Sequence, residues 1–210
     1  MRALPFPAFC RVTLLALPAA LAIAGTVHAE EKTASAVFAG GCFWCMEEAY
    51  DKVDGVLATT SGFSGGHVEA PSYNQVVAGG TGHAEVVKVD YDPERVDYET
   101  LLHVFWRNID PFAVDRQFCD KGASYRSALF PMDADQRALA EASRDAIAER
   151  FDPPIATEIN DFEAFYPAET YHQDYYLENP VRYRFYKSAC GRDERLEEVW
   201  GEEAGASTAS

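Results

Sequence analysis

A cysteine that follows two glycines is the residue of this chain best suited to do chemistry. Gly40, Gly41 and Cys42 come directly after residues 36–39, an apolar run typical of a short buried strand. Apolar residues at helical spacing follow, so we expect the glycine pair to turn a strand into a helix. Free N–H groups and the positive end of a helix dipole stabilise a thiolate at a helix start. We therefore predict that Cys42 is a reactive thiol with a lowered pKa.

The spacing of Cys42 and Cys45 also fits two other kinds of site. Two cysteines three residues apart occur in thioredoxin-like dithiols and in one half of a zinc-thiolate site. A thioredoxin-type motif normally has small residues or proline between its cysteines, whereas two aromatic residues stand there in this chain. Zinc usually takes two close pairs, whereas Cys119 and Cys190 stand alone. A general dithiol-disulfide oxidoreductase is the first alternative, and a zinc-thiolate binding module is the second.

Glu85 is the second residue with chemical potential, because of its place in an alternating strand. In residues 85–91, the odd positions Val87, Val89 and Tyr91 share one apolar face, and Glu85 has the same parity. A carboxyl group on that face loses hydration, which raises its pKa. We predict that Glu85 is a neutral acid able to donate a proton near neutral pH. The alternative is that Glu85 lies at the strand's edge and reaches solvent.

The elements around these residues predict an α+β fold. Strands are expected at residues 36–39, 56–62, 84–91 and 125–130, with helices after Cys42 and after Asp97, and a long amphipathic helix from Asp133 through Arg150. This order contains the ferredoxin-like β-α-β-β-α-β core. We expect a two-layer sandwich with a mixed, mostly antiparallel sheet.

The two ends of the chain are expected to lie outside the domain. Arg2 and Arg11 precede a short apolar run that ends in Val27-His28-Ala29, which predicts a signal peptide over residues 1–29, cleaved after Ala29. A retained membrane anchor is less favoured, because the run is shorter than the ~20 residues that span a bilayer. Residues 30–200 would form one domain, and the small, polar residues 201–210 a disordered tail.

Export and charge restrict the partners. We expect the exported protein to be periplasmic, where thiols become disulfides unless a dedicated reductant keeps them reduced. The formal charge of −16 argues against nucleic acid and against an anionic membrane surface. We expect a monomer.

A series of motifs, in order along the chain, resembles the A-type peptide methionine sulfoxide reductases. They span about Phe38 to Cys190 and are Gly41-Cys42-Phe43-Trp44, Gly62-Phe63-Ser64-Gly65-Gly66, Pro71-Ser72-Tyr73, Thr81-Gly82-His83-Ala84-Glu85, Phe105-Trp106, the run from Asp120 to Ser127, and Phe165-Tyr166-Pro167-Ala168-Glu169 with His172-Gln173. The resemblance implies a protein-repair enzyme of the oxidative stress response. It would reduce the S epimer of methionine sulfoxide, free or in proteins, without a metal or organic cofactor.

The resemblance also implies a role for each site residue. Cys42 would attack the sulfoxide sulfur, and Glu85 would protonate the sulfoxide oxygen. Tyr73 and Tyr125 would hydrogen-bond that oxygen, and Asp120 would support the site. Phe43 and Trp44 would form the apolar wall that receives the substrate's methyl group. Loss of methionine would leave a sulfenic acid on Cys42, which a second thiol converts to a disulfide for a thioredoxin-like partner to reduce.

The thiol that resolves the sulfenic acid stays open among three cysteines. Cys190 lies near the place where relatives carry a C-terminal resolving cysteine, on a segment expected to be mobile. Cys45 stands where many relatives have glycine, one helical turn from Cys42. Cys119 is adjacent to Asp120. We favour Cys190, because thiol exchange needs access and the correct geometry.

Overall fold

The computed structural model describes residues 32–207, and the predicted signal peptide lies outside these residues. The helices and strands, with short 3-10 helices written η, are β1 Ala34–Gly40, α1 Phe43–Asp51, β2 Val56–Ser64, α2 Tyr73–Ala78, β3 Ala84–Tyr91, α3 Tyr98–Arg107, β4 Arg116–Gln117, β5 Asp120–Lys121, η1 Ala123–Tyr125, β6 Ser127–Leu129, α4 Ala134–Arg150, β7 Glu158–Ile159, β8 Phe165–Pro167, η2 Thr170–His172, α5 Tyr175–Glu178, α6 Pro180–Ala189, α7 Arg192–Trp200 and η3 Gly201–Glu203. No helix within residues 32–207 combines the length and the apolar character needed to cross a bilayer.

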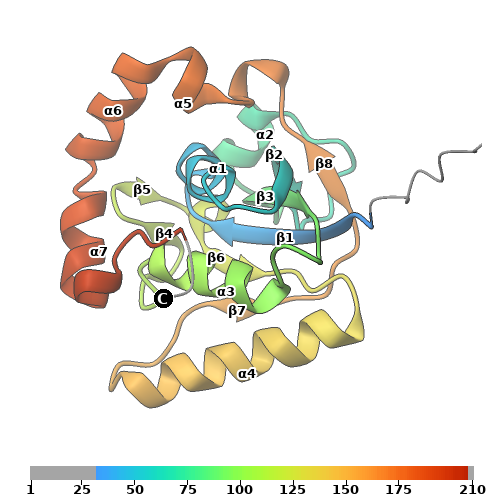
Figure 1. The fold of residues 1–210 in the computed structure, drawn as a ribbon. Helices are drawn as coiled ribbons and strands as arrows, with labels where there is room; N and C mark the ends of the chain where they lie inside the picture. The colour runs from blue at the N-terminus through green and yellow to red at the C-terminus, as the bar shows by residue number, and fades with distance from the viewer. Residues whose placement is uncertain (1–31, 208–210) are drawn as a thin grey trace, which may run out of the picture. The chain divides into compact units, whose positions relative to one another are not determined.

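The main sheet has the strand order β7-β6-β1-β3-β2-β8 (Figure 1). Its neighbours pair antiparallel except β6 and β7, which are parallel. Strands β1, β2, β3 and β6, with helices α1 and α3 as crossovers, form the β-α-β-β-α-β core in the order β6-β1-β3-β2. The predicted α+β fold with a ferredoxin-like core and a mostly antiparallel sheet is confirmed. A separate two-stranded sheet joins β4 to β5.

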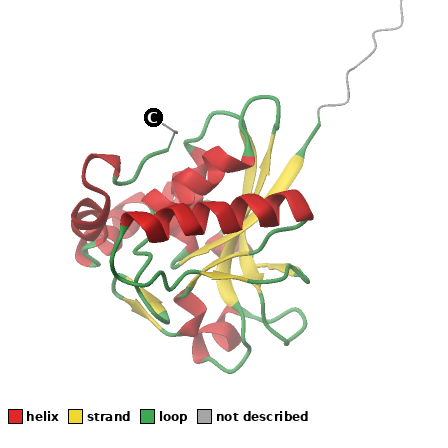
Figure 2. Ribbon diagram, turned by 90° about the horizontal axis from the view of Figure 1, so that it is seen from below, coloured by secondary structure: helices red, strands yellow, loops and turns green. Residues whose placement is uncertain are grey.

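The two faces of the sheet are covered differently. Alternate residues of β1 and β3, such as Phe38 and Val87, enter the main core together with the apolar sides of α1 and α3. Helix α4 packs outside α3, where the Trp106 indole N–H donates to the Ser143 hydroxyl at 3.1 Å. Figure 2 shows α4 as the long helix in front of the sheet. The opposite face carries a smaller cluster around Val86 and Phe130.

The predicted helix starts at two aspartates are confirmed. The Asp97 carboxylate accepts a hydrogen bond from the Thr100 N–H at 2.8 Å, and Asp133 accepts from the Gln136 N–H at 2.8 Å. Each bond satisfies a backbone donor that the first helical turn leaves free, so each helix begins at the following residue. Strand β3 also has the bounds that its alternation predicted.

Residues 125–130 differ from the single strand expected there. They divide into the end of η1, a turn at Arg126 and the three-residue strand β6. Gly122, with a φ of 126°, precedes η1, and the Arg126 N–H bonds back to the Ala123 carbonyl at 3.3 Å. This turn takes Tyr125 out of the sheet, and its side chain lies near Tyr73 and Glu85.

The residues that follow Trp200 are structured rather than disordered as far as Ser207. Helix η3 covers Gly201–Glu203, and the Glu203 carboxylate accepts from the Arg107 Nε at 2.6 Å and pairs with Arg150 at 2.9 Å. The Arg107 guanidinium also lies 4.5 Å from the centre of the Trp200 ring. A buried cation that needs a partner therefore fixes this segment, a requirement that its small, polar composition did not reveal.

Candidate active site

The turn between β1 and α1 places Cys42 where the sequence predicted, at the start of a helix. Gly41 has a φ of 83°, and a Cβ atom there would lie 2.4 Å from the Gln117 Cβ, so only glycine fits. Cys42 is the N-cap of α1, and its carbonyl accepts the N–H of Cys45 at 3.1 Å. Its side chain is only 6% exposed. Tertiary packing therefore encloses the thiol as well as setting it on the helix.

Burial shifts the pKa of Cys42 in the direction opposite to the one expected. Burial raises the pKa of the Cys42 thiol, and the neighbouring Cys45 thiol and the Glu85 carboxyl raise it further. The pKa of Cys45 is lowered instead, first by a hydrogen bond from Cys42 and then by the positive charge of Arg192. The prediction of a lowered Cys42 pKa is wrong, because burial raises this pKa more than the helix N-terminus lowers it. The pair holds its negative charge on Cys45.

Glu85 lies next to the start of α1 as an uncharged acid. The side chain is 1% exposed, and its Oε2 atom accepts the Phe43 N–H at 3.1 Å. Burial raises the pKa of Glu85 to about 8, against the opposing effect of this hydrogen bond. The burial and the raised pKa inferred from strand parity are therefore both present, and the carboxyl holds a proton at neutral pH.

Two tyrosines from separate elements meet beside Glu85. Tyr73 is the first residue of α2, whose start is fixed by a capping box between Ser72 and Gln75. Tyr125 ends η1, close enough to Tyr73 and Glu85 that it affects the pKa of both groups and they affect its own. Burial, and then the Glu85 charge, raise the pKa of both tyrosines, that of Tyr73 to about 12. Both phenols thus stay protonated and able to donate.

Asp120 lies at the start of β5, on the side of Cys42 where α6 packs. Its Oδ2 atom accepts a short hydrogen bond from the Tyr186 hydroxyl of α6. Burial raises the pKa of Asp120, although this hydrogen bond opposes the change. The two-residue strands β4 and β5 are too short to be read from the sequence.

Aromatic side chains form a wall beside the thiols. Phe43 is buried, and its ring centre lies 5.0 Å from that of His172. Trp44 stacks on Tyr175 with ring centres 3.7 Å apart, and its indole N–H donates to the His172 Nδ1 at 3.2 Å. Because Nδ1 accepts, the neutral ring of His172 carries its hydrogen on Nε2. That atom is buried and has no partner within residues 32–207, so it is a donor available to a ligand.

The cysteines divide into two pairs. Cys42 and Cys45 are free and buried, and Cys119 is bonded to Cys190 across 71 residues. Cys190 caps the C-terminal end of α6, so its segment is helical and covalently tied, in contrast to the mobile segment expected. The sequence predicts a bond from Cys42 to one of the other cysteines, so the bond between Cys119 and Cys190 differs from that prediction.

Three tyrosines of the C-terminal helices complete the site and were missed by the sequence analysis. Tyr175, Tyr183 and Tyr186 surround Cys42 and Cys45 from α5 and α6. Tyr183 and Tyr186 are three residues apart, which places both on one side of a helix. This spacing was the available signal, but an aromatic stripe is equally typical of core packing.

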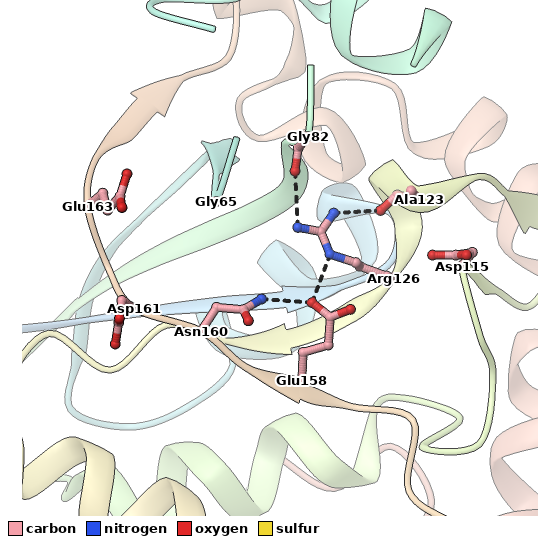
Figure 3. Close-up of a pocket in the computed structure, with 9 residues that line it drawn as sticks. All are labelled: Gly65, Gly82, Asp115, Ala123, Arg126, Glu158, Asn160, Asp161 and Glu163. Atoms are coloured by element: carbon pink, nitrogen blue, oxygen red, sulfur yellow. Dashed lines mark hydrogen bonds and ion pairs between the residues drawn. The ribbon is translucent and has the colours of Figure 1, made fainter. Parts of the chain in front are cut away.

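A separate cavity of about 610 Å³ lies away from the thiols. In Figure 3 the Arg126 guanidinium occupies its centre and bonds the carbonyls of Gly82 and Ala123 and the carboxylate of Glu158. The residues that line this cavity include further acidic groups, and none of them is a cysteine. Arg126 thus joins the segments that lead into β3 and η1, which fixes the backbone next to Tyr125.

Comparisons with known proteins agree with this arrangement. A family model described as peptide methionine sulfoxide reductase matches residues 34–204. A peptide methionine sulfoxide reductase from Caulobacter vibrioides is 46% identical over 195 residues, which is 91% of this chain and 99% of that protein. One from Ligilactobacillus salivarius is 47% identical over 168 residues, 79% of this chain and 97% of that protein.

Solved structures give the same result. The reduced form of Mxr1 from Saccharomyces cerevisiae has a TM-score of 0.67 and 35% identity, covering 72% of this chain and 88% of that one. Methionine sulfoxide reductase A of Corynebacterium diphtheriae has a TM-score of 0.66 and 32% identity, covering 76% of this chain and 81% of that one.

Proposed function

The chain belongs to the peptide methionine sulfoxide reductase family, and from that membership we propose how its own residues carry out the reaction. It is an oxidoreductase that reduces methionine sulfoxide to methionine through thiol-disulfide chemistry. We propose that it takes the S epimer, free and within proteins, as a repair enzyme. The observation that carries this mechanism is the meeting of a buried thiol and a protonated carboxyl at the first turn of α1.

Cys42 is the nucleophile of this proposal. Its sulfur attacks the sulfoxide sulfur, the sulfur-oxygen bond breaks, and the oxygen stays on Cys42 as a sulfenic acid while methionine leaves. Burial disfavours the thiolate of Cys42 before substrate arrives. Ionisation of Cys42 is therefore expected to accompany substrate binding, when the developing negative charge meets the donors around the site.

Glu85 and the two phenols act on the sulfoxide oxygen. Glu85 holds its proton at neutral pH because its pKa is raised to about 8, so it can transfer that proton as negative charge builds on the oxygen. Tyr73 and Tyr125 remain protonated and supply hydrogen bonds to the same atom. Three donors on one oxygen stabilise the transition state more than the neutral sulfoxide.

The aromatic wall selects the substrate. Phe43 and Trp44 present apolar surface beside the thiol, which suits the methyl group of methionine sulfoxide. His172 fixes the indole of Trp44. Asp120 supports the site from the side of Cys42 where α6 packs.

Cys45 is the thiol available to resolve the sulfenic acid in the form of the enzyme described here. It is free, it lies one helical turn from Cys42, and the Cys42 thiol and the charge of Arg192 both lower its pKa and favour its thiolate. Attack by Cys45 on the sulfenic sulfur releases water and leaves a Cys42–Cys45 disulfide. Cys190, favoured from the sequence, and Cys119 can act only after the bond between them is reduced.

Peptide mapping after one turnover tests the resolving step. The unaltered enzyme should contain Cys42 linked to Cys45, with the Cys119–Cys190 bond still present. A Cys45→Ser variant should still release about one methionine per enzyme but accumulate the sulfenic acid. Finding Cys42 linked to Cys190 instead, with Cys45→Ser cycling normally, would return the resolving role to Cys190.

We propose that a thioredoxin-like dithiol reduces the disulfide outside the cytoplasm. The basic start, the short apolar run and Val27-His28-Ala29 support export and cleavage after Ala29. An oxidising compartment such as the periplasm also fits the Cys119–Cys190 bond. Mass spectrometry of protein from fractionated cells should find Glu30 as the first residue of a periplasmic species. An intact leader on cytoplasmic protein would overturn this localisation.

A further inference from the structure

Helix α6 brings two tyrosines to the catalytic thiols although little of the helix is buried. Tyr183 is its one buried residue, whereas Val181 and Phe185 are 74% and 76% exposed. The helix packs chiefly against its chain neighbours α5 and α7. Apolar burial therefore provides little to hold α6 in place over α1, and other contacts must do so.

Those contacts join α6 to the segment that carries Asp120. Cys190, at the end of α6, is bonded to Cys119, the residue immediately before Asp120. Tyr186 lies four residues before Cys190, one helical turn away on the same side. Its hydroxyl donates to the Asp120 carboxylate. Figure 1 shows α6 descending from α5 to α7, the stretch of the fold that this bond connects to β5.

A second set of contacts aligns the same helix with α1. The Tyr183 hydroxyl donates to the Glu48 carboxylate at 2.6 Å, and the Lys187 ammonium pairs with Glu48 at 2.8 Å. These bonds bring the Tyr183 side chain against Cys45 and turn Tyr186, three residues further along the helix, toward Cys42.

The Tyr186 hydroxyl thus lies between two acidic groups and has one proton to share. It donates to Asp120, and the Tyr186 side chain packs against the cluster that contains Cys42, where a hydrogen bond from it lowers the pKa of the thiol. Burial and the charges of the two cysteines raise the pKa of Tyr186 far above its usual range, so the phenol does not ionise. When Cys42 loses its proton, the same O–H can turn from Asp120 to the thiolate.

We propose that Tyr186 is a positioning residue for the nucleophile, and that the Cys119–Cys190 bond holds α6 so that the Tyr186 hydroxyl orients and stabilises the Cys42 sulfur. The inference rests on the proposed role of Cys42. The other titratable groups that face Cys42 are Cys45 from α1, Glu85 from β3 and Tyr73 from α2. Cys45 and Glu85 raise the pKa of Cys42, whereas the Tyr186 hydroxyl lowers it.

The Tyr186→Phe variant tests the hydroxyl, with Tyr176→Phe as its matched control. Tyr176 belongs to the neighbouring helix α5, and its hydroxyl bonds Asp51 rather than a thiol. Cys42 is alkylated with iodoacetamide across a pH series, and the label is located by peptide mapping. Loss of one charge-assisted hydrogen bond should move the alkylation midpoint upward by about one pH unit. The single-turnover rate constant for methionine release at neutral pH should fall about tenfold.

The double variant Cys119→Ser/Cys190→Ser tests whether the Cys119–Cys190 bond holds α6 in place. It should move the Cys42 midpoint in the same direction, and adding Tyr186→Phe should bring little further change, because both act through one hydroxyl. Unchanged midpoints in Tyr186→Phe would overturn the inference. The double variant could instead keep the alkylation midpoint and lose only the turnover that a thioredoxin-like donor supports. That result would contradict the structural role and would mean that the bond transfers electrons.

These outcomes are separable from failure of the proposed function. If Cys42 were not the nucleophile, Cys42→Ser would still release methionine. If only the role of Tyr186 were wrong, Cys42→Ser would be inactive while Tyr186→Phe matched Tyr176→Phe at every pH.

Discussion

Replacing Glu85 with glutamine should impair catalysis and stabilise the fold at the same time. The amide keeps the shape of the side chain and its contact with the Phe43 N–H but has no acidic proton. If Glu85 is the acid that protonates the sulfoxide oxygen, the single-turnover rate constant should fall about 10² to 10⁴-fold. Rapid-quench measurement of methionine release without reductant reports this step directly.

The effect on stability follows from the raised pKa of Glu85. The folded protein holds the proton up to a pKa of about 8, whereas the unfolded chain releases it near the usual value of 4.5. The stability contributed by this proton is complete below pH 4.5 and is lost as the pH rises through 8. At about 1.36 kcal/mol per pH unit, the loss is about 3 kcal/mol by pH 7 and about 5 kcal/mol above pH 8.

Glutamine does not titrate, so the variant should escape that loss. Urea unfolding of both proteins should be measured at pH 5 and pH 7. The free energy of unfolding of the variant, relative to that of the unaltered enzyme, should be higher at pH 7 than at pH 5 by about 2 to 3 kcal/mol. The single-turnover rate of the unaltered enzyme should fall above pH 8, where Glu85 loses its proton, and that of the variant should not. A rate constant near that of the unaltered enzyme, or a stability difference independent of pH, would show that Glu85 is an ionised structural residue.

Three further substitutions have defined outcomes. Cys42→Ser should abolish sulfoxide reduction with every reductant, and retained activity would assign the first step to another thiol. Tyr125→Phe removes one donor to the oxygen and should slow methionine release about 10²-fold without changing thermal unfolding, whereas a change in substrate affinity alone would limit its role to binding. Glu203→Gln should lower the free energy of unfolding at neutral pH by about 1 kcal/mol, because Arg107 and Arg150 lose their carboxylate partner. The control Glu202→Gln should have no effect, because Glu202 forms no ion pair within residues 32–207. Equal unfolding midpoints for the two glutamine variants would mean that the ion pairs of Glu203 do not hold the segment after Trp200 in place.

The parts of the fold that depend on local pattern could be read from the sequence. The alternation of residues 84–91 gave the bounds of β3 and placed Glu85 on the buried face, since side-chain direction in a strand follows from parity. The glycine pair before Cys42 located the start of α1, because a tight strand-to-helix turn requires a residue that tolerates positive φ.

The parts that depend on distant segments could not be read in this way. The Cys119–Cys190 bond joins residues 71 apart, and four cysteines allow several pairings that spacing does not distinguish. Tyr186 reaches Cys42 only because α6 folds back over α1. The direction of the Cys42 pKa was misjudged for the same reason, because the helix start is a local feature whereas burial is set by the whole fold.

The measurement that tests the central claim most directly is a single-turnover assay with each epimer of methionine sulfoxide and no reductant. The S epimer should yield about one methionine per enzyme, together with oxidation located on Cys42, and the R epimer should yield none. Equal yields from the two epimers, or methionine release with Cys42 still reduced, would contradict the account.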